Sequence, residues 1–234
     1  MTTTTDSHPV IAPPRGVDIW CVSLEQPPAA QVRLAAQCSS SEHERAARMP
    51  IAARRRDFLV ARGILRSILG AYLGTAPEHV RIARSAHGKP FIDEPGAPAF
   101  NISHSHVLAV IAVSAGFAVG VDLERVDPLL DVAAIQRWFL SPEEGAHLVA
   151  VPPDARTHAF LRLWTRKEAV AKANGGGIAA GFAIAVPLTG GAAPTFDGVR
   201  TIVDLDPAPG YVAALAYDAP PATLRTPDHA LAHL

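Results

Sequence analysis

Cysteine, lysine and aromatic residues are scarce in this 234-residue sequence, and it has no long hydrophobic run. Its two cysteines, Cys21 and Cys38, cannot form a disulfide framework or a cysteine-rich zinc site. Residues 1–6 lack the basic and apolar regions of a signal peptide. The most apolar stretch, residues 107–121, is too short to cross a bilayer. We therefore expect a soluble, cytoplasmic protein that does not associate with membranes.

The composition favours a folded chain with an aliphatic core. Hydrophobic residues make up 49% of the sequence and charged residues 18%, which excludes global disorder. Only 6% of the residues are aromatic, so alanine, valine, leucine and isoleucine must provide most of the packing. The length is sufficient for two compact units.

Positive charge is concentrated in one short segment, although the net charge is only −1. Residues 45–66 contain seven arginines and one acidic residue, Asp57. A second interpretation of Arg54–Arg56 is a nucleic-acid patch. Phe58 is the one aromatic residue nearby that could stack on a base, and it belongs to an apolar helix stripe. We therefore expect this segment to bind phosphate groups and expect no nucleic-acid partner.

The first half of the sequence predicts a long helix and a buried strand. Residues 17–22 alternate as a strand does, and Ser39 is placed to cap a helix. Residues 52–73 have helical apolar spacing, and Gly74 is placed to end that helix. Residues 107–113 are apolar on both faces, which is typical of a central strand. Shorter extended pieces are expected at residues 80–83, 100–103 and 117–124.

The second half has a similar order of elements. We expect helices at residues 131–140, after Ser141 and at residues 154–173. Strands are expected at residues 181–186, 199–205 and 211–217. The last of these resembles residues 106–112 in sequence, which favours an internal duplication.

These elements predict an α+β, pseudo-duplicated fold of two halves. Each half would be a long helix packed on a small, mostly antiparallel sheet. The expected divisions are a flexible tail at residues 1–15, an N-terminal half at residues 16–116 and a C-terminal half at residues 117–234.

Two acidic residues end the apolar strand Gly120–Glu124. The two-residue period of a strand puts Asp122 and Glu124 on one face, with Val121 and Leu123 on the core side. Carboxylates this close repel each other unless a cation lies between them. A cation site and a solvated strand end are both compatible with these residues alone.

The predicted helix at residues 154–173 carries two of the three lysines of a chain that has 18 arginines. Glu168 and Lys172 are four residues apart, so they share a helix face and could be a simple surface pair. A compact ammonium is not interchangeable with a guanidinium, however. The use of lysine here favours a specific role for Lys172.

The segment before the central strand contains Ser103, His104 and His106. Two histidines at strand spacing could bind a metal, but no third histidine or cysteine lies near them in sequence. A hydrogen-bonded histidine and a phosphate-binding Ser-His pair both remain open. Residues 87–90 form a turn that offers one cation, Lys89.

Together, four motifs resemble a known family. Gly-Lys-Pro, Asn-Ile-Ser-His-Ser, Gly-Val-Asp-Leu-Glu and Trp-Thr-Arg-Lys-Glu-Ala-Val-Ala-Lys occur here in the order typical of 4′-phosphopantetheinyl transferases. The length is similar to the monomeric, surfactin-synthetase-activator (Sfp) type. The resemblance covers residues 39–177, and its last two motifs are the specific ones.

The resemblance implies transfer of 4′-phosphopantetheine from coenzyme A to a serine of an apo carrier protein, with release of 3′,5′-ADP. The carrier would be an acyl, polyketide or peptidyl carrier domain. Asp122, Glu124 and Glu168 match the metal positions of the family, for Mg²⁺ or alternatively Mn²⁺. Glu168 also matches the base that deprotonates the serine, and Lys172 matches the residue that neutralises the pyrophosphate.

The resemblance also implies a coenzyme A site. Ser103 and His104 match contacts to the 3′-phosphate, and Lys89 and Pro90 match the adenine side. Arg45 and Arg56 are the expected further phosphate contacts. The alternative function is a non-catalytic carrier-protein or nucleotide-binding module of the same fold.

Overall fold

The structure, a computed structural model, describes residues 11, 16–127, 129–175, 184–188, 193–194, 200–218 and 224–227. Its helices are α1 (Pro28–Ala36), α2 (Ser40–Ala47), α3 (Ala52–Leu73), α4 (Val132–Phe139), α5 (Pro142–Ala150) and α6 (Arg156–Asn174), with short 3₁₀ turns at Pro77–His79 and Pro153–Ala155. Its strands are β1 (Val17–Ser23), β2 (Ile82–Arg84), β3 (Pro90–Ile92), β4 (Ala99–Ser105), β5 (Leu108–Ser114), β6 (Val119–Arg125), β7 (Ala193–Pro194), β8 (Thr201–Leu205), β9 (Tyr211–Tyr217) and β10 (Leu224–Arg225).

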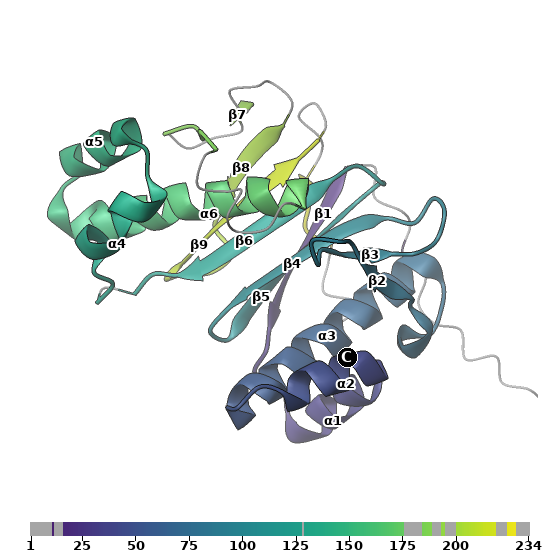
Figure 1. Cartoon of the computed structure of the whole chain (residues 1–234). Helices are drawn as coiled ribbons and strands as arrows, with labels where there is room; N and C mark the ends of the chain where they lie inside the picture. Colours follow the sequence, from purple (N-terminus) through teal and green to yellow (C-terminus); the bar gives the residue numbers. More distant parts are fainter. Residues whose placement is uncertain are drawn as a thin grey trace, which may run out of the picture.

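The N-terminal half has a long helix on a small sheet, as expected, and the strand order of this sheet is β10-β1-β5-β4 (Figure 1). Helix α3 has the expected bounds and ends at Gly74, whose φ of 63° suits a residue without a side chain. Strand β5 lies between β1 and β4, so its prediction as a central strand is confirmed. Its odd-numbered residues, such as Ile111, pack against α3, while its even-numbered residues face the other sheet.

The C-terminal half repeats this plan with α6 on a sheet of order β6-β9-β8-β7 (Figure 1). Strands β6 and β9 are antiparallel, and Asp122 is paired with Ala214. Ala214 and Ala216 face α6, whereas Leu215 and Tyr217 face the first sheet. The two halves therefore confirm the expected α+β fold with a long helix and a small sheet in each.

The two sheets pack together between the two long helices. Their shared core contains Ile19 and Val110 from the first sheet and Val121 and Leu123 from the second. The order of layers is thus α3, first sheet, second sheet and α6. Strands β4 and β6, each the last of its sheet, lie side by side where the sheets meet (Figure 1).

Three parts of the chain differ from the sequence-based expectations. Residues 184–188, where the end of a strand was expected, have no strand, and residues 181–183 lie outside the described residues. Ile11, within the expected flexible tail, packs against the N-terminal core and donates its N–H to the Ala71 carbonyl at 2.9 Å. Strand β10 pairs in parallel with β1, so Leu224–Arg225 belong to the sheet of the N-terminal half.

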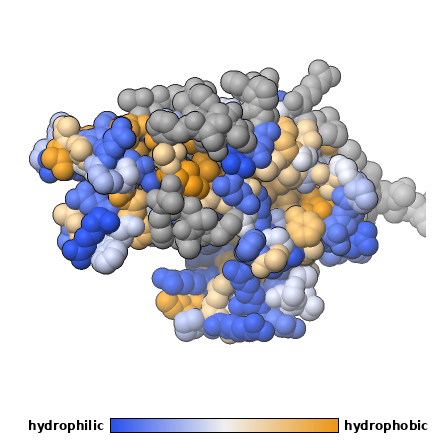
Figure 2. Space-filling model, turned by 45° about the horizontal axis from the view of Figure 1, so that its top comes forward, coloured by the Kyte–Doolittle hydropathy of each residue, from blue (hydrophilic) through white to orange (hydrophobic). Residues whose placement is uncertain are grey.

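Helices α4 and α5 form a lobe at the start of α6. This lobe consists of helices, and α4 has no buried residue. Hydrophobic residues interrupt its hydrophilic surface (Figure 2), and Leu129 and Trp138 are 90% and 66% exposed. Every helix of the described chain is too short or too polar to cross a membrane.

Candidate active site

Strand β6 carries the two predicted carboxylates on one face. Val121 and Leu123 are buried in the core between the sheets. Asp122 and Glu124 point the other way and contact residues of β4 and α6. The alternation expected from the sequence is therefore confirmed.

Helix α6 lies very close to β6 because Gly120 has no side chain. A Cβ atom on Gly120 would collide with the backbone of Ala169 and Ala173. This close approach brings Glu168 and Lys172, one turn apart, over the carboxylates of β6. The surface-pair interpretation of these two residues is wrong, since Glu168 is 5% exposed and Lys172 bonds to β6.

Lys172 forms an ion pair with the first of the carboxylates. Its ammonium lies 2.6 Å from Asp122 Oδ1 and 2.9 Å from Ser103 Oγ, to both of which it donates. The Ser103 hydroxyl in turn donates to the same Asp122 oxygen at 2.9 Å. The second oxygen of Asp122 is buried and has no hydrogen-bond partner among the described residues.

The carboxylates influence one another. Burial and the neighbouring Asp122 raise the pKa of Glu168 to about 7, although Lys172 acts against this. Burial and Asp122 also raise the pKa of Glu124, while hydrogen bonds from Ser105 and Trp164 lower it. The group therefore has more negative charge than its one lysine neutralises.

This donor set has the chemistry of a site for a hard divalent cation. Asp122, Glu124 and Glu168 offer only oxygen atoms, which suit Mg²⁺ or Mn²⁺. The unpartnered Asp122 oxygen is an available ligand. Across the described residues, no three His, Cys, Asp or Glu side chains are grouped closely enough to hold an ion as they stand. Lys172 is the cation that contacts Asp122 in this arrangement.

A cavity of about 1000 Å³ lies in the N-terminal half of the molecule, beside β4. Helices α2 and α3 and strands β2, β3 and β4 form its walls. Four of the residues predicted to bind coenzyme A line it, namely Arg45, Arg56, Pro90 and His104. The cavity is lined by three further arginines, which are Arg54, Arg62 and Arg84. This concentration of guanidinium groups makes the cavity suitable for a large anion.

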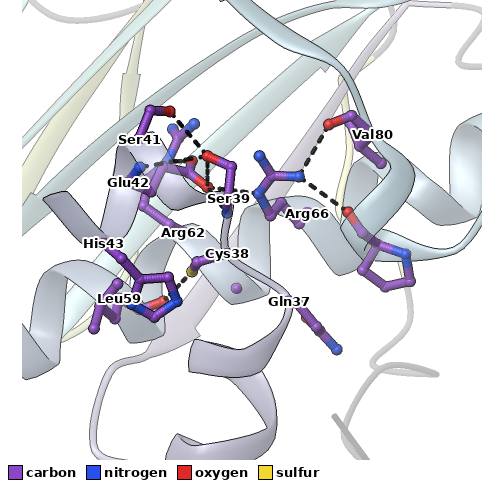
Figure 3. A network of polar contacts seen from close by, with 12 residues as sticks. Gln37, Cys38, Ser39, Ser41, Glu42, His43, Leu59, Arg62, Arg66 and Val80 are labelled. Atoms are coloured by element: carbon purple, nitrogen blue, oxygen red, sulfur yellow. Dashed lines mark hydrogen bonds and ion pairs between the residues drawn. The ribbon is translucent and has the colours of Figure 1, made fainter. Parts of the chain in front are cut away.

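One arginine of the cavity, Arg62, is paired with a buried carboxylate, Glu42 (Figure 3). Glu42 accepts from Arg62 Nε at 2.5 Å and from Arg66 Nε at 2.7 Å, and all three residues are buried. Burial alone would raise the pKa of Glu42, but the two arginines and the Ser39 N–H lower it to about 2. Glu42 also completes the capping box of α2, as Ser39 predicted.

Neighbouring positive charges also shift the pKa values of two groups that line the cavity, Arg84 and His104. Partial burial lowers the pKa of Arg84, and the charges of Arg45 and Arg62 lower it further. Burial and Lys172 likewise lower the pKa of His104, against the opposing effect of Asp57. Burial is the larger cause of both shifts, and the neighbouring positive charges add to it.

Two of the predicted coenzyme A residues lie elsewhere. Ser103 faces Asp122 and Lys172, not the cavity, because adjacent residues of a strand point in opposite directions. Lys89 donates from its ammonium to the carbonyls of Val119 at 3.1 Å and Ala173 at 2.9 Å. It therefore joins the turn before β3 to β6 and to the end of α6.

The sequence analysis missed Arg84 and Ser105, and it included Arg54 and Arg62 only as members of the segment 45–66 that was expected to bind phosphate groups. Arg54, Arg62 and Arg84 line the cavity, and Ser105 bonds to Glu124. Arg62 follows Phe58 by one helical turn, a spacing that could have shown that both face the cavity. Ser105 lies two residues after Ser103 on a strand, a spacing that could have shown that both side chains face the carboxylates.

Two family models match the chain, one on each half. The model described as "4'-phosphopantetheinyl transferase, N-terminal" matches residues 25–116. The model described as "4'-phosphopantetheinyl transferase superfamily" matches residues 118–206. The first includes the arginine-lined cavity, and the second includes the carboxylates of β6 and α6.

Curated relatives agree with these matches. The chain is 40% identical to the 4′-phosphopantetheinyl transferase HetI of Nostoc sp. over 74% of both proteins. It is 30% identical to a 4′-phosphopantetheinyl transferase of Bacillus subtilis over 68% of this chain and 71% of that protein. The Sfp protein of Bacillus subtilis is 30% identical over 49% of this chain and 50% of its own length. With carboxylates and lysine on one side of β4 and an arginine-lined cavity on the other, this chain belongs to the 4′-phosphopantetheinyl transferase superfamily.

Proposed function

We propose that the chain transfers 4′-phosphopantetheine from coenzyme A to a serine of an apo acyl, polyketide or peptidyl carrier protein, in a Mg²⁺-dependent reaction that releases 3′,5′-ADP. One observation carries this proposal: β4 separates a cationic cavity from a carboxylate and lysine cluster. A pyrophosphate ester with a 3′-phosphate needs both environments, one for its phosphate groups and one for a metal ion and a base.

The arginine-lined cavity is the proposed site for the nucleotide part of coenzyme A. Arg45 and Arg56 approach it from α2 and α3, and His104 approaches it from β4. Guanidinium groups form charge-assisted hydrogen bonds to phosphate oxygens. Arg56 also pairs with its neighbour Asp57, but its side chain is 53% exposed and can contact a ligand as well.

The carboxylate cluster is the proposed metal site. Asp122, Glu124 and Glu168 would hold Mg²⁺, or Mn²⁺ in its place. The bound ion would supply charge neutralisation at the pyrophosphate. Lys172 contributes to the same task, and its ion pair with Asp122 places its ammonium next to the metal ligands.

Glu168 is the proposed general base. The proton of the carrier serine passes to its carboxylate, directly or through a water molecule. The serine oxygen then bonds to the phosphorus that carries pantetheine, and the bond from that phosphorus to 3′,5′-ADP breaks. Burial and the neighbouring Asp122 raise the pKa of Glu168 to about 7 when no cation is bound, so its carboxylate is a stronger base than that of an ordinary glutamate. Lys172 stabilises the charge that develops on the departing 3′,5′-ADP.

An intact-mass measurement tests this function. An apo carrier protein is incubated with the enzyme, coenzyme A and Mg²⁺, and the phosphopantetheine mass should appear on the carrier serine. Acyl, polyketide and peptidyl carriers are compared in parallel, with a chelator as the control for the metal. Binding of coenzyme A or of a carrier without any mass increase would instead support a non-catalytic module of the same fold.

The enzyme is proposed to act as a monomer. The cavity and the carboxylate cluster are both formed by residues of a single chain. Sedimentation of the active enzyme at assay concentration tests this assignment.

A further inference from the structure

The two sheets are joined at β4 and β6 by side chains instead of backbone bonds. Each strand ends its own sheet in the described structure. Asn101 Oδ1 accepts from the Val121 N–H at 2.9 Å, and Ser105 Oγ accepts from the Arg125 N–H at 3.1 Å. Both bonds join residues 20 apart in sequence, so the two strands run parallel in constant register. Polar side chains of β4 thus satisfy N–H groups that the edge of β6 would otherwise leave unpaired.

Ser105 has a second bond that Asn101 lacks. Its hydroxyl donates to Glu124 Oε2 at 3.0 Å while it accepts from the backbone of β6. A backbone N–H is held rigidly within a strand, so it fixes the hydroxyl oxygen, and the hydroxyl hydrogen then orients the carboxylate. Glu124 is also hydrogen-bonded by Trp164 of α6, so the carboxylate is held from both halves of the molecule.

We propose that Ser105 is a positioning residue that holds the Glu124 carboxylate in the orientation a divalent cation requires. Ser103 has a comparable contact with Asp122, but its hydroxyl is shared with the Lys172 ammonium. Among the described residues, the Ser105 hydroxyl bonds to the Glu124 carboxylate and to the backbone of β6, and Ser105 also lines the arginine cavity. The inference rests on the proposed metal site but not on the transfer reaction.

Two variants that are nearly isosteric with each other separate the effect of the hydroxyl group from the effect of side-chain volume. Ser105→Thr keeps the hydroxyl, whereas Ser105→Val replaces it with a methyl group, and both β-branched residues suit a strand. The direct readout is Mn²⁺ binding, measured by electron paramagnetic resonance on the purified protein. Residues that orient metal ligands are worth about 10–100-fold in affinity, so Ser105→Val should weaken Mn²⁺ binding by at least about tenfold. Ser105→Thr should stay close to the wild type.

Asn101→Ala is the matched control. It removes a bond of the same seam that reaches only the backbone of Val121 and touches no carboxylate. Thermal unfolding should show a loss of stability in both Asn101→Ala and Ser105→Val, while Mn²⁺ affinity falls only in the second. If Ser105→Val does not fold, Ser105→Ala replaces it with a smaller change in shape.

Several results would overturn the inference. They are wild-type Mn²⁺ affinity in Ser105→Val, an equal loss of affinity in Asn101→Ala, or a wild-type protein that binds no Mn²⁺. The transfer assay is read separately. A carrier that gains mass while Ser105→Val binds Mn²⁺ normally leaves the proposed function intact and removes Ser105 from it. Absence of transfer together with Ser105-dependent Mn²⁺ binding removes the function and keeps the positioning role.

Discussion

The arginine-lined cavity and the carboxylate cluster differ in the burial and the neutralisation of their charges. In the cavity, Arg45 and Arg84 are exposed, and of the five arginines that line it only the buried Arg62 is paired with Glu42. Net positive charge is therefore left facing open space, where a ligand can neutralise it. This arrangement favours binding of an anion over stability of the empty site.

The carboxylate cluster is buried and partly neutralised from within. Asp122 and Glu168 are 4% and 5% exposed, and the ammonium of Lys172 contacts the first of them. Burial makes each uncompensated charge more costly, which is why the pKa of Glu168 rises. The exposed arginines therefore keep their charge available to an anion, whereas in the buried cluster a lysine of the same chain neutralises one carboxylate.

The largest expected effect comes from the buried side. Asp122→Asn keeps the volume of the residue but removes the charge of the proposed metal ligand. Transfer should fall by about 10²–10³-fold or more, the size typical of losing one electrostatic contact in an active site. Asp204→Asn is the control, because Asp204 also pairs with a residue of α6, Arg166, outside the cluster. Steady-state rates for the two variants at equal folded concentration check this, and wild-type turnover in Asp122→Asn would contradict the metal assignment.

Acid should reduce the contribution of Glu42, the carboxylate that pairs with Arg62 and Arg66, to the stability of the fold. The pKa of Glu42 is about 2 in the folded protein against an ordinary 4.5, so its stabilisation is present above about pH 4.5 and is lost as the pH falls toward 2. The shift corresponds to about 3 kcal/mol of unfolding free energy. Urea denaturation of the wild type and of Glu42→Gln at several pH values should show this acid-dependent difference between them. If the free energies of unfolding of the two proteins changed with pH in the same way, the ionised Glu42 carboxylate would not be what stabilises the arginine pair.

His104→Ala tests the exposed side. If His104 contacts the 3′-phosphate, the variant should bind coenzyme A more weakly while its affinity for dephospho-coenzyme A hardly changes. A charge-assisted bond is worth about 1.5–3 kcal/mol, which corresponds to about a tenfold to hundredfold loss. Calorimetric titration with both ligands gives the two affinities, and equal weakening of both would place His104 at another part of the nucleotide.

Lys172→Arg gives the smallest of the four expected effects. The variant keeps the positive charge, but a planar guanidinium cannot occupy the position of a compact ammonium between Asp122 and Ser103. We expect about a tenfold loss in kcat, less than the about 10²–10³-fold that follows removal of a whole donor. KM for coenzyme A should change little. A wild-type kcat, with thermal unfolding unchanged, would show that charge alone is sufficient at this position.

Local patterns along the chain predicted most of the fold. The apolar spacing of residues 52–73 and the glycine after it set the bounds of α3, since helical period and capping are local properties. The alternation of Val121, Asp122 and Leu123 placed the carboxylate away from the core for the same reason. The strand expected at residues 184–186 failed, and β10 could not be foreseen as a partner of β1, because pairing between distant segments has no local signature.

The sequence by itself determined that Glu168 and Lys172 share a helix face and that Asp122 and Glu124 share a strand face, because both placements follow from local periodicity. Only the tertiary structure decided what each residue touches. Packing around Gly120 brings α6 onto β6, and the seam places Ser105 against Glu124. It also directs Lys89 to α6 and not to the cavity. Such contacts join residues far apart in sequence, so they depend on how the two sheets meet and not on any pattern within one segment.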